Sequence, residues 1–189
     1  MPQARTLAKS QIKQVVEVIR SCSRYPSRDI SMLLLTHLCG LRVGEVATLK
    51  INDVIDATGK VLDEITLSAQ VTKNNQARKV MLPRKMQCHL QEHINEMSRI
   101  PSHGYLFSTQ KQSHFTPNTA SQHLKRLYQR AGIAGATSHS GRRTWLTTLS
   151  QKGVSVFVLA EMAGHRDLKH TARYVSVNDV VKRNAAELI

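Results

Sequence analysis

Apolar residues recur along most of the chain at the spacing of an α-helix. Residues 9–22 predict an amphipathic helix because their apolar positions follow the i, i+3, i+4, i+7 rule. Those positions are Ile12, Val15, Val16 and Ile19. A second helix opens at Pro26 and ends at Gly40, and a short third helix covers residues 43–49.

The pattern changes between residues 61 and 83, where β-branched residues appear in alternation with polar ones. Residues 65–67 and 79–82 predict two short strands, with Asn74 and Asn75 at the turn between them. Helical spacing then returns. It predicts helices over about residues 84–98, 117–131, 140–151, 155–163 and 169–174, and a tail helix from Asn178. We therefore expect the α+β fold class, mainly α-helical with one small antiparallel β-sheet, as a single domain over residues 1–189.

The charge balance indicates the class of partner. The chain carries 27 Lys and Arg against 13 Asp and Glu, a formal net charge of +14 at pH 7. That excess suits a polyanion, because phosphate contacts supply most of the sequence-independent affinity for nucleic acids. An anionic membrane surface is the alternative. It usually requires one basic amphipathic helix, whereas here the charge is spread along the chain, so we favour a nucleic acid.

Several site and segment types are not predicted. No apolar run approaches the roughly 20 residues that span a bilayer, and residues 1–10 lack the apolar core of a secretory signal. We expect no membrane partner and a cytoplasmic, nucleoid-associated protein. The three cysteines form neither a CxxC pair nor a metal-ligand spacing, and no GxxxxGK[ST] loop or two-metal carboxylate cluster stands out. We therefore expect no metal and no cofactor.

Four short motifs carry the candidate chemistry. They are GLRVGE at residues 40–45, HSGR at residues 139–142, GH at residues 164–165, and Tyr174, nine residues after that histidine. Each is weak alone, since an HxxR pair is commonly a capping histidine with a surface arginine. In this order and spacing they resemble the catalytic domain of the phage integrase family of tyrosine recombinases, over about residues 27–178. The length is similar to that of the short, stand-alone invertases of the fimbrial-switch type.

The resemblance implies site-specific DNA recombination, with integration, excision or inversion as the outcome. Tyr174 would be the nucleophile: it attacks phosphorus, forms a 3′-phosphotyrosyl link and releases a 5′-hydroxyl. A 5′-hydroxyl of a partner strand then reverses the step, so neither ATP nor a divalent metal is needed. The resemblance also implies double-stranded DNA as the partner, a homo-oligomer (dimer or tetramer) on that DNA, and accessory DNA-bending proteins.

The remaining catalytic roles follow from the same resemblance. Arg42 and Arg142 would bind the scissile phosphate, because the guanidinium fork matches phosphate and stays charged at any working pH. A tyrosine hydroxyl, with a pKa of about 10, needs a base or a strong positive field. His139 resembles the family's general base. His165 would donate a hydrogen bond to the phosphate and help to position the nucleophile.

A hairpin lysine of this family protonates the departing 5′-oxygen, and Lys73 fits that role best. Lys79 on the returning strand and Lys60 before the hairpin are the alternatives. Such a proton donor typically contributes roughly 10² to 10⁴ in rate. Glu45, three residues after Arg42, would orient the arginines or the histidine, with an ordinary surface carboxylate as the alternative.

The sequence departs from the family pattern in two places. Family members commonly carry Asp-Leu inside the HxxR segment, where Ser140 and Gly141 stand here. Many integrases also carry an N-terminal core-binding domain, which we do not expect here; a stand-alone protein and an excised fragment both fit the sequence. The tail, residues 175–189, carries an apolar stripe at helical spacing, and we expect it either to dock on a neighbouring protomer or to pack on its own domain.

Two other function classes use the same residues. A type IB topoisomerase would relax DNA with this chemistry, and a DNA-binding regulator would keep the fold without cutting. The motif spacing and the short chain favour the recombinase over the topoisomerase, and the presence of each catalytic residue type argues against the regulator. The target sequence and the choice of outcome are not predicted, since both depend on base contacts, DNA shape and the arrangement of sites.

Overall fold

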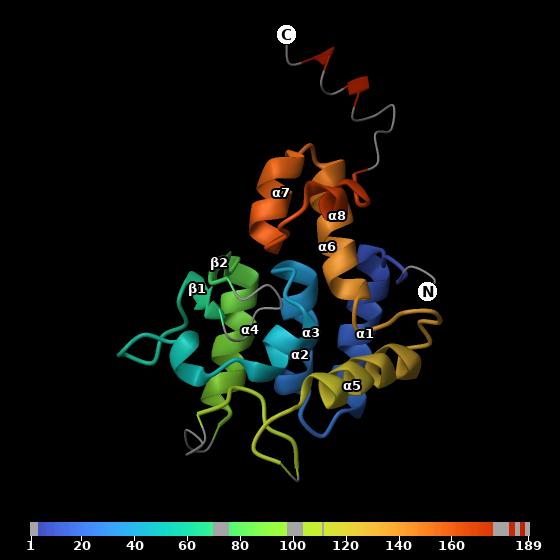
Figure 1. The fold of residues 1–189 in the computed structure, drawn as a ribbon. Helices are drawn as coiled ribbons and strands as arrows, with labels where there is room; N and C mark the ends of the chain where they lie inside the picture. The colour runs from blue at the N-terminus through green and yellow to red at the C-terminus, as the bar shows by residue number, and fades with distance from the viewer. Residues whose placement is uncertain are drawn as a thin grey trace.

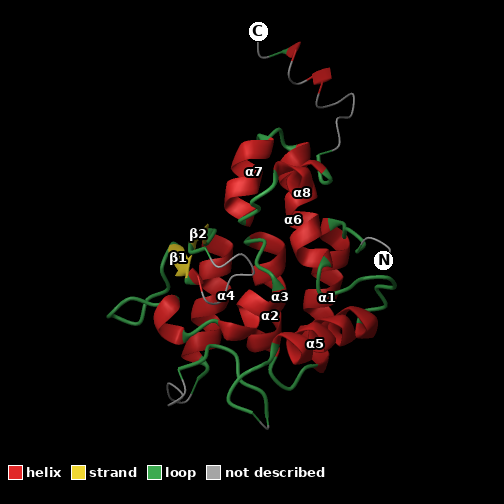
Figure 2. Ribbon diagram, viewed as in Figure 1, coloured by secondary structure: helices red, strands yellow, loops and turns green. Residues whose placement is uncertain are grey.

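The protein is an assembly of helices with a two-stranded sheet at one side of its described part (Figures 1 and 2). The computed structural model describes residues 4–69, 76–97, 104–110, 112–175, 182–183 and 186–187. The elements are α1 (Lys9–Cys22), α2 (Pro26–Leu38), α3 (Val43–Thr48), the 3₁₀ turn η1 (Ile51–Asp53), β1 (Glu64–Leu67), β2 (Arg78–Met81), α4 (Arg84–Asn95), α5 (Pro117–Arg130), α6 (Ser140–Gln151), α7 (Val156–Ala163) and α8 (Leu168–Ala172). The predicted fold class is confirmed. Among the residues described, no helix is long and apolar enough to cross a membrane.

Most predicted helices begin and end within a residue or two of their predicted bounds. The last described one is shorter than expected, because the amide of Tyr174 donates to the Thr171 carbonyl three residues back, at 2.9 Å. Tyr174 therefore follows α8 in a tight turn instead of continuing the helix. The hairpin turn at residues 74–75 and most of the predicted tail helix lie outside the described residues.

Helix α2 forms the centre of the main core. Residues on every side of it are buried, as expected for a helix enclosed by others, and α1, α3, α4 and α6 pack around it (Figure 1). Its apolar residues Ile30, Leu33 and Leu34 lie in this core, and the partly buried Leu38 packs against it. The main core therefore holds both the end of α2 and the turn that follows it, where the GLRVGE motif begins.

The sheet determines which side chains face the interior. Strands β1 and β2 pair antiparallel, with Ile65 opposite Val80. Because side chains alternate along a strand, Arg78 lies on the same face as buried Val80, whereas Lys79 lies on the opposite, exposed face. This alternation separates two neighbouring basic residues into different environments.

A second apolar cluster joins the last described helices. Trp145 and Leu146 of α6 pack with Leu159 and Ala163 of α7, and Tyr174 packs against this cluster from the end of α8. In Figure 1, α7 and α8 stand together beside the end of α6, beyond the main core. Helices α6, α7 and α8 form a unit, the α6–α8 unit, that holds Tyr174. The arginine of the GLRVGE motif, Arg42, is held by the main core instead.

Gly40, in the turn between α2 and α3, lies against Trp145 of the second cluster. Its φ of +66° lies in the left-handed region, and a Cβ at this position would overlap the indole ring of Trp145. The chain can turn from α2 into α3 here only with a residue that lacks a side chain.

We predict that Gly40→Ala lowers the free energy of unfolding by about 2–5 kcal/mol. The left-handed backbone accounts for roughly 1–2 kcal/mol and the overlap with Trp145 for a further 1–3 kcal/mol. Gly153→Ala is the matched control, since Gly153 also has positive φ (+83°) but a Cβ added there would meet no atom within 4 Å. Urea unfolding of both variants measures the difference, and equal losses would contradict the packing account.

Candidate active site

The GLRVGE motif forms the start of α3 and places a carboxylate against an arginine. Arg42 is the residue that precedes the helix, and Glu45 occupies its first turn. Glu45 accepts the backbone N–H of Arg42 at 2.7 Å and also its side-chain Nη1–H at 2.9 Å. A carboxylate is favoured at a helix N-terminus, so one side chain both caps the helix and holds the guanidinium. Glu45 is only 2% exposed and is therefore not an ordinary surface carboxylate.

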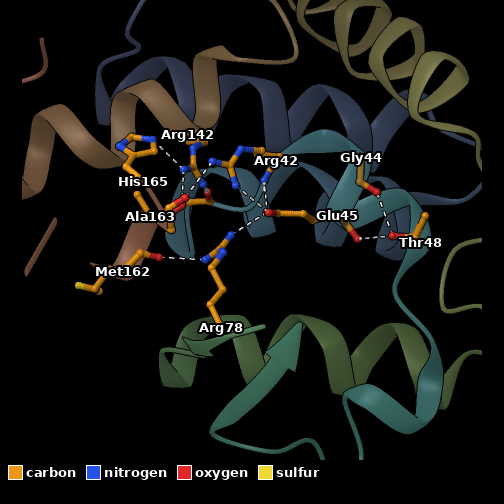
Figure 3. A network of polar contacts seen from close by, with 11 residues as sticks. Arg42, Gly44, Glu45, Thr48, Arg78, Arg142, Met162, Ala163 and His165 are labelled. Atoms are coloured by element: carbon orange, nitrogen blue, oxygen red, sulfur yellow. Dashed lines mark hydrogen bonds and ion pairs between the residues drawn. The ribbon is translucent and has the colours of Figure 1, made fainter. Parts of the chain in front are cut away.

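A second arginine reaches the same carboxylate from the sheet. Arg78 donates from Nη2 to Glu45 Oε2 at 2.7 Å and from Nη1 to the Met162 carbonyl at 2.9 Å (Figure 3). Sequence reasoning missed Arg78. The available signal was the strand alternation, which places an arginine on the same face as Val80.

Arg142, on the first turns of α6, links the main core to α7. It donates to the Gly40 carbonyl and to the Ala163 carbonyl, each at 2.6 Å. Burial, with repulsion from Arg42 and Arg78, lowers the pKa of Arg142 to about 9. The group is still positively charged at pH 7.

Three guanidiniums therefore converge on the C-terminal end of α7. Successive carbonyls, those of Met162, Ala163 and Gly164, accept from Arg78, Arg142 and Arg42, the last at a longer distance of 3.4 Å (Figure 3). The last carbonyls of a helix lack intrahelical partners and carry the negative end of the helix dipole. Together with the Glu45 carboxylate they offset the repulsion among the three arginines. Three positive charges against one full negative charge leave a surplus that suits an anion.

Gly164 is required for this arrangement. It ends α7 in the left-handed conformation, with φ +64°, and a Cβ there would lie 2.7 Å from Arg78 Cδ. A cleft of about 670 Å³ opens beside the group and is lined in part by Arg42, Arg78 and His165. The glycine of the GH motif thus provides room for an arginine that is far away in sequence.

His165 is held as an acceptor toward the arginines. Its Nε2 lies 3.1 Å from Arg142 Nη2, and a guanidinium can only donate, so Nε2 carries no proton. The proton is then on Nδ1, which donates to the Thr171 hydroxyl at 2.8 Å. Burial, with repulsion from Arg142 and Arg42, lowers the pKa of His165 to about 4. The donation to a phosphate that the sequence predicts for His165 stays a prediction, and it requires a proton on Nε2.

Tyr174 lies beside this histidine. The rings of Tyr174 and His165 are nearly parallel, with centroids 6.4 Å apart and an interplanar angle of 22°. Tyr174 is close enough to Arg142 that its phenolate would raise the pKa of that arginine.

Of the predicted site residues that the structure describes, His139 is not joined to this network. His139 precedes α6 and is exposed, and no contact of the described residues links its ring to the arginines. Lys73 lies outside the described residues, and its role stays a prediction. Of the alternatives, Lys79 is exposed and pairs with Glu64 at 2.6 Å, which raises the pKa of the lysine. Among the residues described, no group of three or more His, Cys, Asp or Glu side chains could hold a metal ion.

The departure inside the HxxR segment has a packing cause. Gly141 lies against α2, and a Cβ there would overlap the side chain of Thr36. A leucine at this position would therefore separate α6 from α2. Ser140 accepts the Thr137 backbone N–H at 3.0 Å, the kind of local hydrogen bond that aspartate also makes at a helix start.

Comparison with known proteins identifies relatives over nearly the whole chain. Residues 5–180 match the phage integrase family. A tyrosine recombinase of Pseudothermotoga lettingae is 32% identical over 180 residues, which are 95% of this chain and 58% of that protein. Tyrosine recombinase XerA of Pyrococcus furiosus is 26% identical over 186 residues, 97% of this chain and 61% of the relative. The chain thus spans less than two thirds of the length of these curated relatives.

Solved structures share the fold. The crystal structure of XerA recombinase superposes with a TM-score of 0.78 at 23% identity, covering 100% of this chain and 66% of that chain. XerH site-specific recombinase, in a pre-cleavage complex with its difH substrate, gives a TM-score of 0.72 at 22% identity, covering 96% of this chain and 53% of that chain. At this identity the comparison concerns the fold alone.

We predict that His165 titrates at about pH 4 in the DNA-free protein and is protonated on Nδ1 when neutral. Its folded-state pKa lies below the usual value of 6.5, so the imidazole is neutral at pH 7 and gains its proton only as the pH falls toward 4. Nitrogen-15 NMR of labelled histidine measures both properties, with His165→Gln to assign the signal. A midpoint at or above 6.5, or a proton on Nε2, would contradict the arrangement.

Proposed function

The chain belongs to the phage integrase family, and on this premise we propose that it is the catalytic domain of a tyrosine site-specific DNA recombinase. It would cut and rejoin DNA strands through a 3′-phosphotyrosyl intermediate. The observation that carries the proposal is the convergence of Arg42, Arg142 and His165 at the end of α7, with Tyr174 stacked beside that histidine. These residues come from separate motifs, and the fold brings them together beside a cleft that Arg42 and His165 line in part.

The two motif arginines are suited to different parts of phosphate binding. Arg142 is 7% exposed and tied to two carbonyls at short distance, so its position is fixed. The side chain of Arg42 is 22% exposed, and its bond to the Gly164 carbonyl is long. The Nη2 group of Arg42 can therefore turn toward a phosphate at little cost in free energy, while Arg142 supplies a fixed positive field. Preorganised charge of this kind stabilises the negative charge that develops as phosphorus is attacked.

The proposed reaction is a transesterification. Tyr174 Oη attacks phosphorus, a P–Oη bond forms, and the bond to the 5′-oxygen breaks. We assign the role of accepting the Tyr174 proton to His139, which directly precedes α6, three residues before Arg142. We assign the role of protonating the 5′-oxygen to Lys73. His165 would position Arg142 and donate to the phosphate after gaining a proton on Nε2. Rejoining is the same set of steps in reverse, with a 5′-hydroxyl as the nucleophile.

The partners in this proposal are double-stranded DNA, further copies of the chain on that DNA as a dimer or tetramer, and accessory proteins that bend it at the nucleoid. The net charge of +14 supports the first of these. We further propose that residues 1–189 form one catalytic domain, and that the tail at residues 175–189 is a contact between protomers.

We predict that Tyr174→Phe abolishes formation of a covalent protein–DNA adduct while leaving DNA binding within a few-fold of the unmodified protein, because only the attacking oxygen is lost. The assay incubates the protein with a nicked suicide duplex that bears the repeats flanking its gene, followed by denaturing electrophoresis. Tyr25→Phe is the control, since Tyr25 is an exposed tyrosine stacked under Arg28. An adduct that survives in Tyr174→Phe would identify another nucleophile, and DNA binding without any adduct would favour the regulator.

We predict that Lys73→Ala slows cleavage by roughly 10² to 10⁴ and that a bridging sulfur in place of the 5′-oxygen restores the rate. A thiolate leaves without a proton, because the pKa of a thiol is about 8.5. The measurement is single-turnover cleavage of both substrates, with Lys79→Ala as the control because that lysine pairs with Glu64 on the exposed face. The reverse pattern, with Lys79→Ala slow and rescued by sulfur, would transfer the role to Lys79.

A further inference from the structure

We propose that Arg78 is a positioning residue for strand cleavage: it holds Glu45, and through Glu45 the Arg42 guanidinium, against the end of α7. This inference rests on the proposed function. It concerns a residue outside the four motifs, on the strand that follows the hairpin.

The two oxygens of Glu45 have different partners. Oε1 accepts from Arg42 Nη1 at 2.9 Å, whereas Oε2 accepts both the Arg42 backbone N–H and Arg78 Nη2, each at 2.7 Å. The bonds with Arg42 span three residues at the start of one helix, so they fix the pair only with respect to α3. Arg78 is the tie from a different element, 33 residues away in sequence. It therefore determines where the Arg42–Glu45 pair lies relative to the rest of the site.

The other terminal nitrogen of Arg78 bonds to α7. Nη1 donates to the Met162 carbonyl of α7, the helix whose next two carbonyls accept from Arg142 and Arg42. Arg78 thus bridges the carboxylate that orients one arginine and the helix end that orients both (Figure 3). Loss of this bridge would leave Arg42 with its local contact and a long bond to α7.

The burial of Arg78 supports a specific role. Its side chain is 9% exposed, and burial lowers its pKa although Glu45 opposes that shift. Its Nε is buried without a hydrogen-bond partner. A buried charge with an incompletely satisfied guanidinium gives little net stability, so stability alone is a weak reason for an arginine here. Gly164, which leaves room for Arg78 Cδ, shows that the opposite wall is fitted to this side chain.

The geometry favours positioning over direct contact with DNA. Both terminal nitrogens of Arg78 are committed, one to Glu45 and one to Met162. The Arg42 side chain is 22% exposed, against 9% for that of Arg78. Arg42 is therefore the arginine that can turn toward a phosphate. Arg78 would therefore act on the reaction through Glu45.

The experiment is a double-mutant cycle on single-turnover cleavage at saturating DNA, using Arg78→Met, Glu45→Gln and the double variant. We expect Arg78→Met to slow cleavage by about 10- to 100-fold, the usual effect of removing a group that orients a reacting residue, with DNA affinity little changed. The double variant should be no slower than the slower single variant, because both changes break one interaction. Arg78→Lys, which keeps the charge but cannot fork between two acceptors, should recover part of the rate.

The controls distinguish positioning from unfolding, from a phosphate contact and from action on the leaving group. Lys85→Met removes a positive charge from an exposed residue of α4, the helix that follows the same strand, and should cleave at the unmodified rate. Thermal unfolding shows whether each variant is folded at the assay temperature; if Arg78→Met is not, Arg78→Lys with Glu45→Gln carries the cycle. If cleavage by the double variant is slowed by the product of the two single-variant factors, the inference is overturned. It is also overturned by a defect confined to DNA affinity, which indicates a phosphate contact, or by rescue with a bridging sulfur, which indicates action on the leaving group.

Failure of this inference and failure of the proposed function give different results. If the wild-type protein cleaves DNA and Arg78→Met cleaves it equally fast, Arg78 has no role in cleavage and the recombinase proposal still stands. If the wild-type protein binds DNA but never forms an adduct, the proposed function is wrong, and so is the role of Arg78 in it.

Discussion

The structure depends on holding three like charges together in a mostly buried place. Guanidiniums this close repel one another, and burial deprives them of the water that would screen them. The Glu45 carboxylate and the C-terminal carbonyls of α7 supply the compensating negative charge. The compensation is incomplete, and the remaining positive charge suits a phosphodiester. The interactions that stabilise the site therefore also determine what it can bind.

This constraint explains how the two apolar clusters are joined. Arg142 bonds to the turn after α2 through Gly40 and to α7 through Ala163, so one side chain spans the main core and the α6–α8 unit. Arg78 makes a corresponding link from the sheet. Tyr174 belongs to the α6–α8 unit, and its position relative to Arg42 depends on these links. A change in one arginine is therefore expected to alter the position of Tyr174 without direct contact.

Local sequence signals predicted the parts of the molecule that local interactions determine. Helical periodicity gave the fold class and most helices, and the three-residue spacing of Arg42 and Glu45 is that of a residue before a helix and its first turn. Arg78 was missed because its partners, Glu45 of α3 and the Met162 carbonyl of α7, are distant in sequence. Strand alternation indicates only the face of the sheet on which Arg78 lies. The acceptor role of His165 toward Arg142 depends likewise on a contact between distant segments. The close approach of α6 to α2 at Gly141 was unpredictable for the same reason.

The proposed recombinase requires the arginine cluster to present a DNA phosphate to Tyr174. The most direct test is to trap the covalent complex, digest the DNA and the protein, and locate the attached nucleotide by tandem mass spectrometry. The chain has 4 tyrosines, so the assignment is unambiguous. We expect a nucleotide linked through phosphate to the peptide that contains Tyr174. A nucleotide on Tyr25, Tyr105 or Tyr128, or on a residue of another type, would contradict it.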